Sequence, residues 1–157
     1  MQHYRAEDFT ARSSIGYLFK RAHLLLIDQL EIAVADSDLT ATQWVLLMHL
    51  RDGLAINATD LCAQLRHDSG ALTRVIDQLE SRGLVRRERS REDRREVQLR
   101  LTDAGVQTVA SLVPKVVEKL NFALRDFSRS EFSELKRLVN KLITSLDHAG
   151  KKPGEAA

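Results

Sequence analysis

The most regular hydrophobic pattern in the chain lies at residues 68–81. Apolar residues recur there at steps of three and four, while the positions between them are small or polar. This spacing places the apolar side chains on one face of a helix. We therefore predict a short helix with a hydrogen-bonding outer face and a buried face formed by Leu72, Val75, Ile76 and Leu79.

The same stretch continues on both sides as a helix-turn-helix with a hairpin. Asn57 is a favourable N-cap for a preceding helix, and residues 55–56 could form a short strand before it. Gly83 is typical of a helix end. Strands are predicted from Leu84 and over residues 96–101, where alternation directs three side chains inward: Val97, Leu99 and Leu101.

Long amphipathic helices flank this unit. Residues 7–34 predict one helix, whose apolar residues recur at helical spacing. Thr40 with Gln43 and Ser128 with Glu131 form capping boxes that begin two further helices. Thr102 begins another helix, and residues 150–157 are predicted to be a disordered tail. The apolar stripe of the first helix comprises Ile15, Leu18, Phe19, Ala22, Leu25, Leu26 and Leu30.

The predicted fold is mainly α with a small β-hairpin wing. A winged helix-turn-helix at residues 39–101 is flanked by dimerisation helices at residues 1–38 and 102–149. The apolar stripes of the flanking helices could be buried against each other and against a second copy of the chain. A two-fold homodimer would place its two recognition helices about 34 Å apart, one turn of DNA.

Composition limits the cellular setting. The chain has 157 residues, of which 43% are hydrophobic, enough for one core with helical extensions. No apolar run approaches the roughly 18 residues of a membrane span, and the first residues lack the order of a signal peptide. A single cysteine fits a reducing cytoplasm, so we expect a cytoplasmic protein without membrane contact.

Positively charged residues are concentrated in one stretch of the chain, although the net charge of the whole chain is small. The net charge is only +2, yet residues 66–100 contain ten arginines, no lysine and seven acids. Arginine favours planar, bidentate recognition of phosphates and base edges. Double-stranded DNA is therefore the expected partner, whereas a merely solvated hairpin is the alternative.

Three segments resemble the MarR family of bacterial transcription regulators: LTATQWVLLMHL (39–50), ALTRVIDQLESRGLVRRERSREDRREVQLRLTDAG (71–105) and SRSEFSELKRLVNKL (128–142). The resemblance implies major-groove roles at the start of the second helix and a wing-tip Asp-x-Arg motif. In that motif an arginine enters the minor groove and the aspartate holds the wing arginines. The chain departs from many relatives at Gly70, where they carry a larger or hydroxyl residue. The implied DNA-binding residues are Ser69, Gly70, Ala71, Thr73, Arg74, Asp93, Arg94 and Arg95.

The resemblance further implies a sequence-specific repressor that binds a pseudo-palindromic operator and is released by a small aromatic or phenolic effector. In the family the effector site lies between the dimerisation helices and the DNA-binding lobe. Each candidate lining residue is also explained by ordinary packing. The candidates are Tyr17, His23, Trp44, Met48 and Arg51.

Other functions remain open at this stage. Cys62 could make the protein a redox-sensing repressor, although a buried structural thiol on the inward face of its helix is the favoured interpretation. An architectural DNA-binding protein without an effector would bind with little sequence preference and a steep salt dependence. The five histidines are scattered, so neither a metal site nor a cofactor is expected. No nucleophile elbow or phosphate-binding glycine loop suggests an enzyme.

Overall fold

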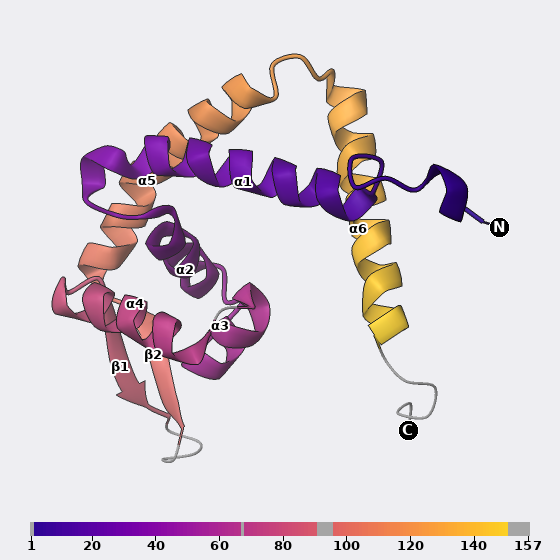
Figure 1. The fold of residues 1–157 in the computed structure, drawn as a ribbon. Helices are drawn as coiled ribbons and strands as arrows, with labels where there is room; N and C mark the ends of the chain where they lie inside the picture. The colour runs from indigo at the N-terminus through magenta and orange to yellow at the C-terminus, as the bar shows by residue number, and fades with distance from the viewer. Residues whose placement is uncertain (1, 67, 91–95, 151–157) are drawn as a thin grey trace. The chain divides into compact units, whose positions relative to one another are not determined.

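The computed structural model describes residues 2–66, 68–90 and 96–150 (Figure 1). The chain divides into two compact units, Met1–Leu120 and Asn121–Ala157. Its described part is mainly helical with one antiparallel hairpin, which confirms the predicted fold class. The elements are η1 (Ala6–Asp8), α1 (Ile15–Val34), η2 (Ala35–Ser37), α2 (Ala41–Arg51), α3 (Ala58–Leu65), α4 (Ser69–Ser81), β1 (Val85–Arg89), β2 (Val97–Leu101), α5 (Asp103–Ala123) and α6 (Arg129–Gly150).

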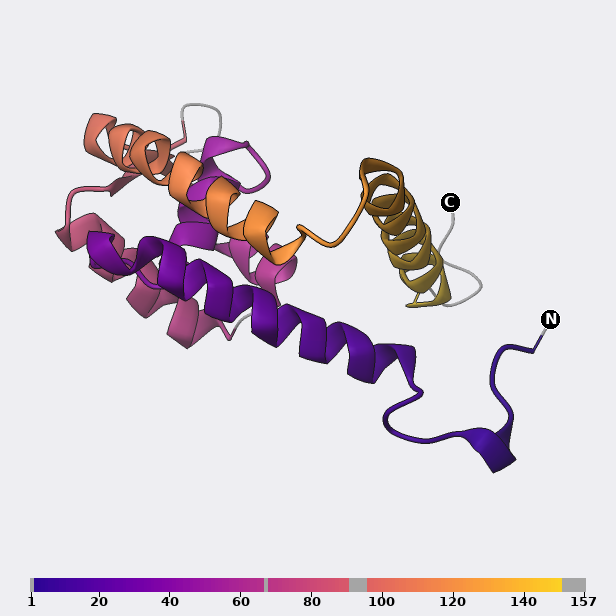
Figure 2. The same ribbon diagram turned by 90° about the horizontal axis from the view of Figure 1, so that it is seen from above.

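The first long helix begins at Ile15, so the predicted start at residue 7 is wrong (Figure 2). Thr10 and Ser13 divert the chain by local hydrogen bonds that compete with a helix. The Thr10 backbone N–H donates to Ser13 Oγ at 3.1 Å, and Ser13 Oγ donates to the Thr10 carbonyl at 3.0 Å. The Tyr4 hydroxyl then accepts a hydrogen bond from the Ile15 N–H at 2.9 Å, which satisfies one free donor of α1.

The predicted capping box of α2 is confirmed. Thr40 Oγ1 accepts from the Gln43 N–H at 3.2 Å, and Gln43 Oε1 accepts from the Thr40 N–H at 3.1 Å. Trp44 follows on the buried face and is only 3% exposed. Gly53, with a φ of +67°, turns the chain after α2.

One hydrophobic core joins α2, α3, α4, the base of the hairpin and α5. The predicted inner face of α4 is confirmed, because Leu72, Ile76 and Leu79 are almost fully buried and Val75 packs against them in part. Each such side chain stabilises the fold by about 1.5–3 kcal/mol. The largest fully buried side chains are Leu46, Leu47, Leu61, Leu72, Ile76, Leu79, Val34, Val85 and Val109.

The hydrophobic core covers only part of the hairpin. Val85 pairs with Leu101 at one end, whereas Arg89 pairs with Val97 at the other. Val97 is 47% exposed, so its predicted inward orientation is wrong; it lies beyond the part of the hairpin that the core covers. Residues 55–56 do not form the suggested strand, although the Leu99 N–H donates to the Ile56 carbonyl at 2.7 Å.

Close backbone contact joins the start of α5 to β1. Thr102 Oγ1 accepts from the Gly105 N–H at 3.0 Å and donates to the Gly83 carbonyl at 2.5 Å, which confirms Thr102 as the cap. A Cβ on Gly105 would overlap the Leu84 carbonyl oxygen and lie 3.1 Å from its carbon. Only glycine allows this approach.

The second unit contains the end of α5 and all of α6. The predicted capping box is present: the Glu131 N–H donates to Ser128 Oγ at 3.2 Å, and the Ser128 N–H donates to Glu131 Oε2 at 2.8 Å. None of the described side chains of α6 is buried, and four of its large apolar side chains are exposed: Leu135, Leu138, Ile143 and Leu146. The helix extends through Gly150, one residue into the predicted tail, while residues 151–157 lie outside the described part.

Candidate nucleic-acid interface

The N-terminus of α4 is held open toward solvent by an aspartate cap. Arg66, with a φ of 49°, ends α3 in the left-handed conformation and turns the chain. Asp68 Oδ1 then accepts from the N–H groups of Gly70 and Ala71, both at 3.0 Å. A Cβ on Gly70 would lie 3.2 Å from that oxygen, which is tighter than an ordinary contact. Gly70 therefore leaves the cap unstrained.

The outer face of α4 carries the residues expected to contact the major groove. All five are exposed, as a DNA-reading face requires. The Thr73 hydroxyl donates to the Ser69 carbonyl at 2.8 Å, which leaves its oxygen available as an acceptor. Arg74 makes no ion pair within residues 2–66, 68–90 and 96–150, so its guanidinium is available for a phosphate or a guanine. The five are Ser69, Gly70, Ala71, Thr73 and Arg74.

Strand β1 lies beside α4 (Figure 1). Its Arg87 binds that helix instead of projecting into solvent. Arg87 Nη2 pairs with Asp77 Oδ1 at 2.6 Å, and the same guanidinium pairs with Glu80. The hydrogen bond to Asp77, reinforced by Glu80, raises the pKa of Arg87 above its ordinary value. Sequence reasoning missed this contact, although Asp77 and Glu80 are three residues apart and so share one helix face.

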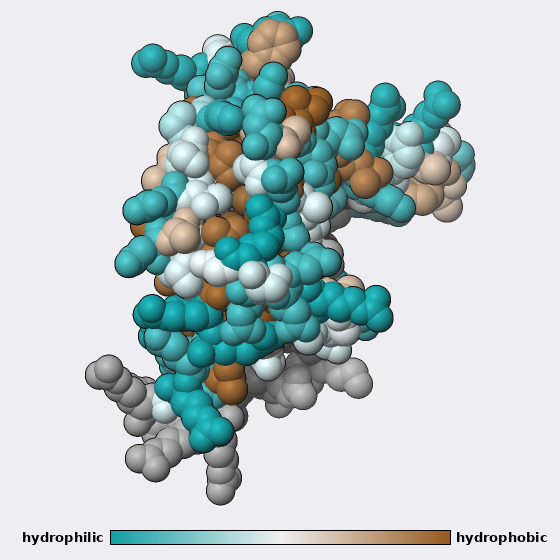
Figure 3. Space-filling view, turned by 90° about the vertical axis from the view of Figure 1, so that its left-hand side faces the viewer, coloured by the Kyte–Doolittle hydropathy of each residue, from teal (hydrophilic) through white to brown (hydrophobic). Residues whose placement is uncertain are grey.

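The outward face of the hairpin pairs two arginines directly across the strands. Arg86 lies opposite Arg100, an arrangement that is destabilising unless each charge has a partner. Arg86 Nε pairs with Glu88 at 2.7 Å, and Arg100 Nη2 donates to Gln98 Oε1 at 2.9 Å. The lower part of the surface in Figure 3, at the height of α4 and the hairpin, is largely hydrophilic. Such a surface is suited to a hydrated polyanion.

The wing-tip motif falls between the two strands. Asp93, Arg94 and Arg95 lie outside the described residues. Their roles in the minor groove stay predictions.

The five candidate effector residues occupy different surroundings. Trp44 is a core residue, Met48 packs partly against the core, and His23 is exposed. Arg51 Nε pairs with Asp52 at 2.7 Å and lowers the pKa of that carboxyl. Tyr17 lines an open hollow of about 400 Å³ on α1 that includes none of the other four; its further lining residues are Lys20, Arg21, Leu24 and Leu25.

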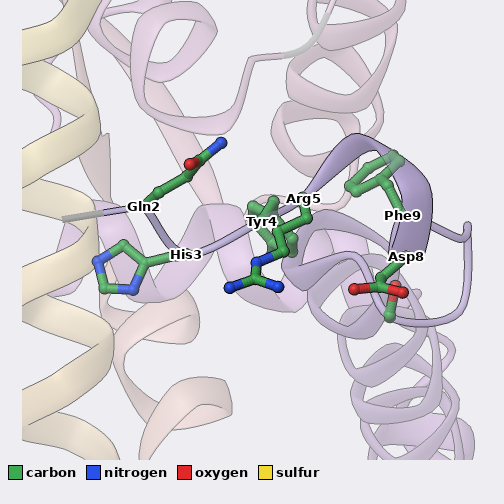
Figure 4. A pocket seen from close by; sticks show the side chains of 7 residues that line it. Gln2, His3, Tyr4, Arg5, Asp8 and Phe9 are labelled. Carbon is green, nitrogen blue, oxygen red and sulfur yellow. The ribbon is translucent and has the colours of Figure 1, made fainter.

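A second hollow, of about 370 Å³, lies among the residues that precede α1 (Figure 4). Within it, the Tyr4 ring meets Phe9 edge to face, with centroids 5.4 Å apart. None of the candidate effector residues lines it. All its lining residues belong to this short segment: Gln2, His3, Tyr4, Arg5, Asp8, Phe9 and Ser13.

Three further features bear on the alternatives. Cys62 is half-buried on α3 and packs against the core. Within the part of the chain that the structure describes, no cluster of three histidine, cysteine or acidic side chains is suited to a metal. No described helix combines the length and apolarity that crossing a membrane would need.

Comparisons with known proteins agree with this geometry. The sequence profile of the MarR family matches residues 39–97, from the start of α2 to the first residue of β2. The HTH-type transcriptional regulator MgrA of Staphylococcus aureus is 31% identical over 115 residues, which cover 73% of this chain and 77% of MgrA.

Two solved structures share the fold. A mutant MarR of E. coli complexed with operator DNA has a TM-score of 0.73 and 27% identity, over 82% of this chain and 92% of that one. BpsR of Bordetella bronchiseptica, whose DNA binding is regulated by 6-hydroxynicotinic acid, has a TM-score of 0.73 and 27% identity, over 85% of this chain and 96% of BpsR. The chain with this capped, arginine-bearing helix and hairpin therefore belongs to the MarR family of DNA-binding transcription regulators.

Proposed function

We propose that the protein is a homodimeric, sequence-specific repressor, released from a pseudo-palindromic operator by a small aromatic or phenolic effector. The observation that carries the proposal is the outer face of α4. Its N-terminus is capped by Asp68, its small residues permit close approach to base edges, and Arg74 has no partner in the described chain. These properties match a helix that reads the major groove.

Dimerisation would account for the exposed apolar side chains of α1 and α6. Ile15, Leu18 and Leu25 on α1 and Leu138 and Leu146 on α6 are all exposed in the isolated chain. Burying apolar surface contributes about 25 cal/mol per Å², and an isologous interface would cover these helices in both copies.

Release by an effector requires two arrangements of the dimer with different affinities for the ligand. An effector that favours a half-site spacing unlike that of the operator weakens DNA binding by that difference. The hollow beside Tyr17 combines apolar walls with the cations Lys20 and Arg21. An aromatic acid fits this chemistry, and the regulation of BpsR by 6-hydroxynicotinic acid supports the class.

Fluorescence-anisotropy titration tests the proposal. The duplexes are the intergenic DNA upstream of the protein's own gene and a scrambled control, at fixed salt, with and without salicylate as a generic aromatic acid. Preference for the upstream duplex that salicylate weakens is the expected result. Equal binding to both duplexes, with genome-wide mapping that finds no preferred site, contradicts sequence-specific regulation and favours the architectural alternative.

A preference that salicylate leaves unchanged would contradict this effector but not regulation itself. Peroxide titration then tests the redox alternative. If DNA is fully released while mass spectrometry finds Cys62 unmodified, oxidation of that thiol is not the switch.

A further inference from the structure

The recognition helix α4 is attached at its C-terminal end to the segment that leads out of α1. This segment ends at Asp38, which adopts the left-handed conformation with a φ of 55°. Its last carbonyls consequently cannot continue a helical ladder. Arg82, just after α4, donates from Nη1 to the Asp38 carbonyl at 2.7 Å and from Nη2 to the Ser37 carbonyl at 3.0 Å.

The contact is chemically selective for arginine. A guanidinium offers two parallel donors in a rigid fork, whereas a lysine ammonium is a point charge. A cation is also favourable where a helical segment ends, because its free carbonyls carry partial negative charge. Arg82 therefore binds both carbonyls at once, across 44 positions of sequence in one case and 45 in the other.

One helical turn earlier, Gln78 makes a second attachment. Gln43 Nε2 donates to Gln78 Oε1 at 3.0 Å. The Gln43 side chain is buried, with 6% exposure, and its Oε1 also accepts from the Thr40 N–H. Gln43 thus connects the cap of α2 to the recognition helix. Since Gln78 and Arg82 are four residues apart, they present one edge of α4 to residues 37–43.

A third contact holds the same segment from α5. Lys115 Nζ lies 3.3 Å from Asp36 Oδ2, but both side chains are half or more exposed. An exposed pair of this kind contributes little. Leu39 and Leu79 share one hydrophobic core, which joins the two elements without fixing direction. The described polar contacts that join residues 37–43 to α4 are those of Gln78 and Arg82.

We propose that Gln78 and Arg82 are positioning residues that fix the angle between the recognition helix and α1, and so determine which half-site spacing the dimer accepts. The inference rests on the proposed function, in which α1 belongs to the dimer interface and two copies of α4 read one operator. Neither side chain needs to contact DNA. Loss of the attachment would let each reading unit rotate and would broaden the range of accepted spacings.

The test uses the full-length protein and a duplex selected by it from a random-sequence library. Derivatives of the duplex have the centre between half-sites lengthened in single-base-pair steps, and affinities are measured by anisotropy. For Arg82→Ala and Gln78→Ala, we expect the discrimination between the best and the lengthened duplexes to fall by at least about fivefold. Arg82→Lys can bind one carbonyl, so its discrimination between the best and the lengthened duplexes should lie between that of Arg82→Ala and that of the parent.

Arg86→Ala is the matched control, since it removes the same charge from an exposed arginine whose ion pair with Glu88 stays within β1. It is expected to change affinity by the same factor for every spacing. Parental discrimination in both Arg82→Ala and Gln78→Ala would overturn the proposal. If the parent protein selects no duplex at all, the proposed function fails instead.

Hydrogen exchange in the DNA-free protein tests the attachment separately. In Arg82→Ala, amides of residues 37–43 should exchange at least about fivefold faster, while the core amides of Leu72 and Ile76 keep their protection. Unchanged exchange at residues 37–43 would overturn the attachment, whatever the protein does with DNA.

Discussion

Thr73 and Arg74 are adjacent on α4, yet their side chains are engaged differently. Thr73 bonds back to the Ser69 carbonyl, whereas Arg74 extends without a partner in the described chain. A side chain that is already bonded to its own helix has fewer directions available. Base discrimination should therefore depend more on Arg74 than on Thr73.

Replacing Arg74 with alanine is expected to reduce discrimination between the best duplex and single-base variants by about 1–3 kcal/mol, the value of a good bidentate base contact. Competition binding at fixed salt measures it. Arg137→Ala removes an equal charge from α6, where Arg137 pairs with Glu134 in the same helix, and serves as the control. Undiminished discrimination would place Arg74 on the phosphate backbone.

Gly105 is the residue at which a single methyl group should matter most. Its absent side chain permits the contact between α5 and the Leu84 carbonyl. Gly105→Ala must displace backbone rather than a flexible side chain, so we expect a loss of about 1–3 kcal/mol in the free energy of unfolding.

Gly16→Ala is the control for that change, because the added methyl would meet only Ser14 Oγ, at 3.6 Å. Alanine is favoured over glycine inside a helix, so this variant should be as stable as the parent or more stable by up to about 1 kcal/mol. Urea unfolding of both variants decides the matter. Equal stabilities would show that α5 can move away from β1 without cost.

At the scale of elements, the hairpin is joined to α4 by Arg87. This arginine neutralises Asp77 and Glu80, two carboxylates on the helix that is proposed to read DNA. Without it, both carboxylates would repel the phosphates of bound DNA, and the hairpin would lose one polar contact with α4. Arg87 is thus engaged in contacts within the protein and is not free to contact DNA.

We expect Arg87→Ala to weaken DNA binding more than Arg86→Ala, although each variant loses one positive charge. The ion pair itself should be modest, because 33% of the Arg87 side chain is exposed. A double-mutant cycle with Asp77→Ala is expected to give a coupling of about 0.2–1 kcal/mol in unfolding. If Arg87→Ala and Arg86→Ala bind DNA with equal affinity, the contact of Arg87 with α4 does not matter for DNA binding.

The start of α6 should respond to acid. Hydrogen bonds from the Ser128 side chain and backbone hold the pKa of Glu131 below its ordinary value of 4.5. The lowered pKa means that the cap stabilises α6 above pH 4.5 and loses this contribution as the pH falls through the folded pKa.

In Ser128→Ala, we expect the pKa of Glu131 to rise toward 4.5 and the acid response of the first turn of α6 to weaken, because the backbone N–H of residue 128 still donates to Glu131. Carbon-13 NMR of the Glu131 carboxyl, followed through a pH titration, measures the pKa directly. Glu134 is an internal reference, because Arg137 lowers its pKa independently of Ser128. A Glu131 titration that Ser128→Ala leaves unchanged would contradict the capping account.

At the scale of the whole molecule, the proposed dimer would account for the exposed apolar side chains of α1 and of α6. Leu138→Glu should convert dimer to monomer, since a charge would be buried in an apolar interface. Asn140→Glu adds the same charge two positions along and should leave the dimer intact. Sedimentation analysis of both variants measures the mass, and a dimeric Leu138→Glu would remove this face from the interface.

Much of the architecture was predictable because it depends on local order. Helical periodicity identified the buried face of α4, and short-range hydrogen-bonding patterns identified the caps at Thr40, Asn57, Thr102 and Ser128. Each of these features joins residues at most four positions apart. The five candidate residues on the outer face of α4 followed from the same periodicity, with the family resemblance, and all are exposed.

Contacts between residues far apart in the sequence could not be predicted from such local patterns. The residue at which α1 begins depends on Tyr4, eleven positions before Ile15, and the exposure of Val97 depends on how far the core extends along the hairpin. Arg82 and Arg87 are both arginines in one basic stretch, yet one binds carbonyls at the end of the α1 segment and the other binds carboxylates on α4. Sequence alone determined which segments are helical, their caps and the exposed face of α4 that is proposed to read DNA, because local sterics and hydrogen bonding decide them. Only tertiary structure decided which arginines are engaged within the protein, because folding alone brings their partners within reach.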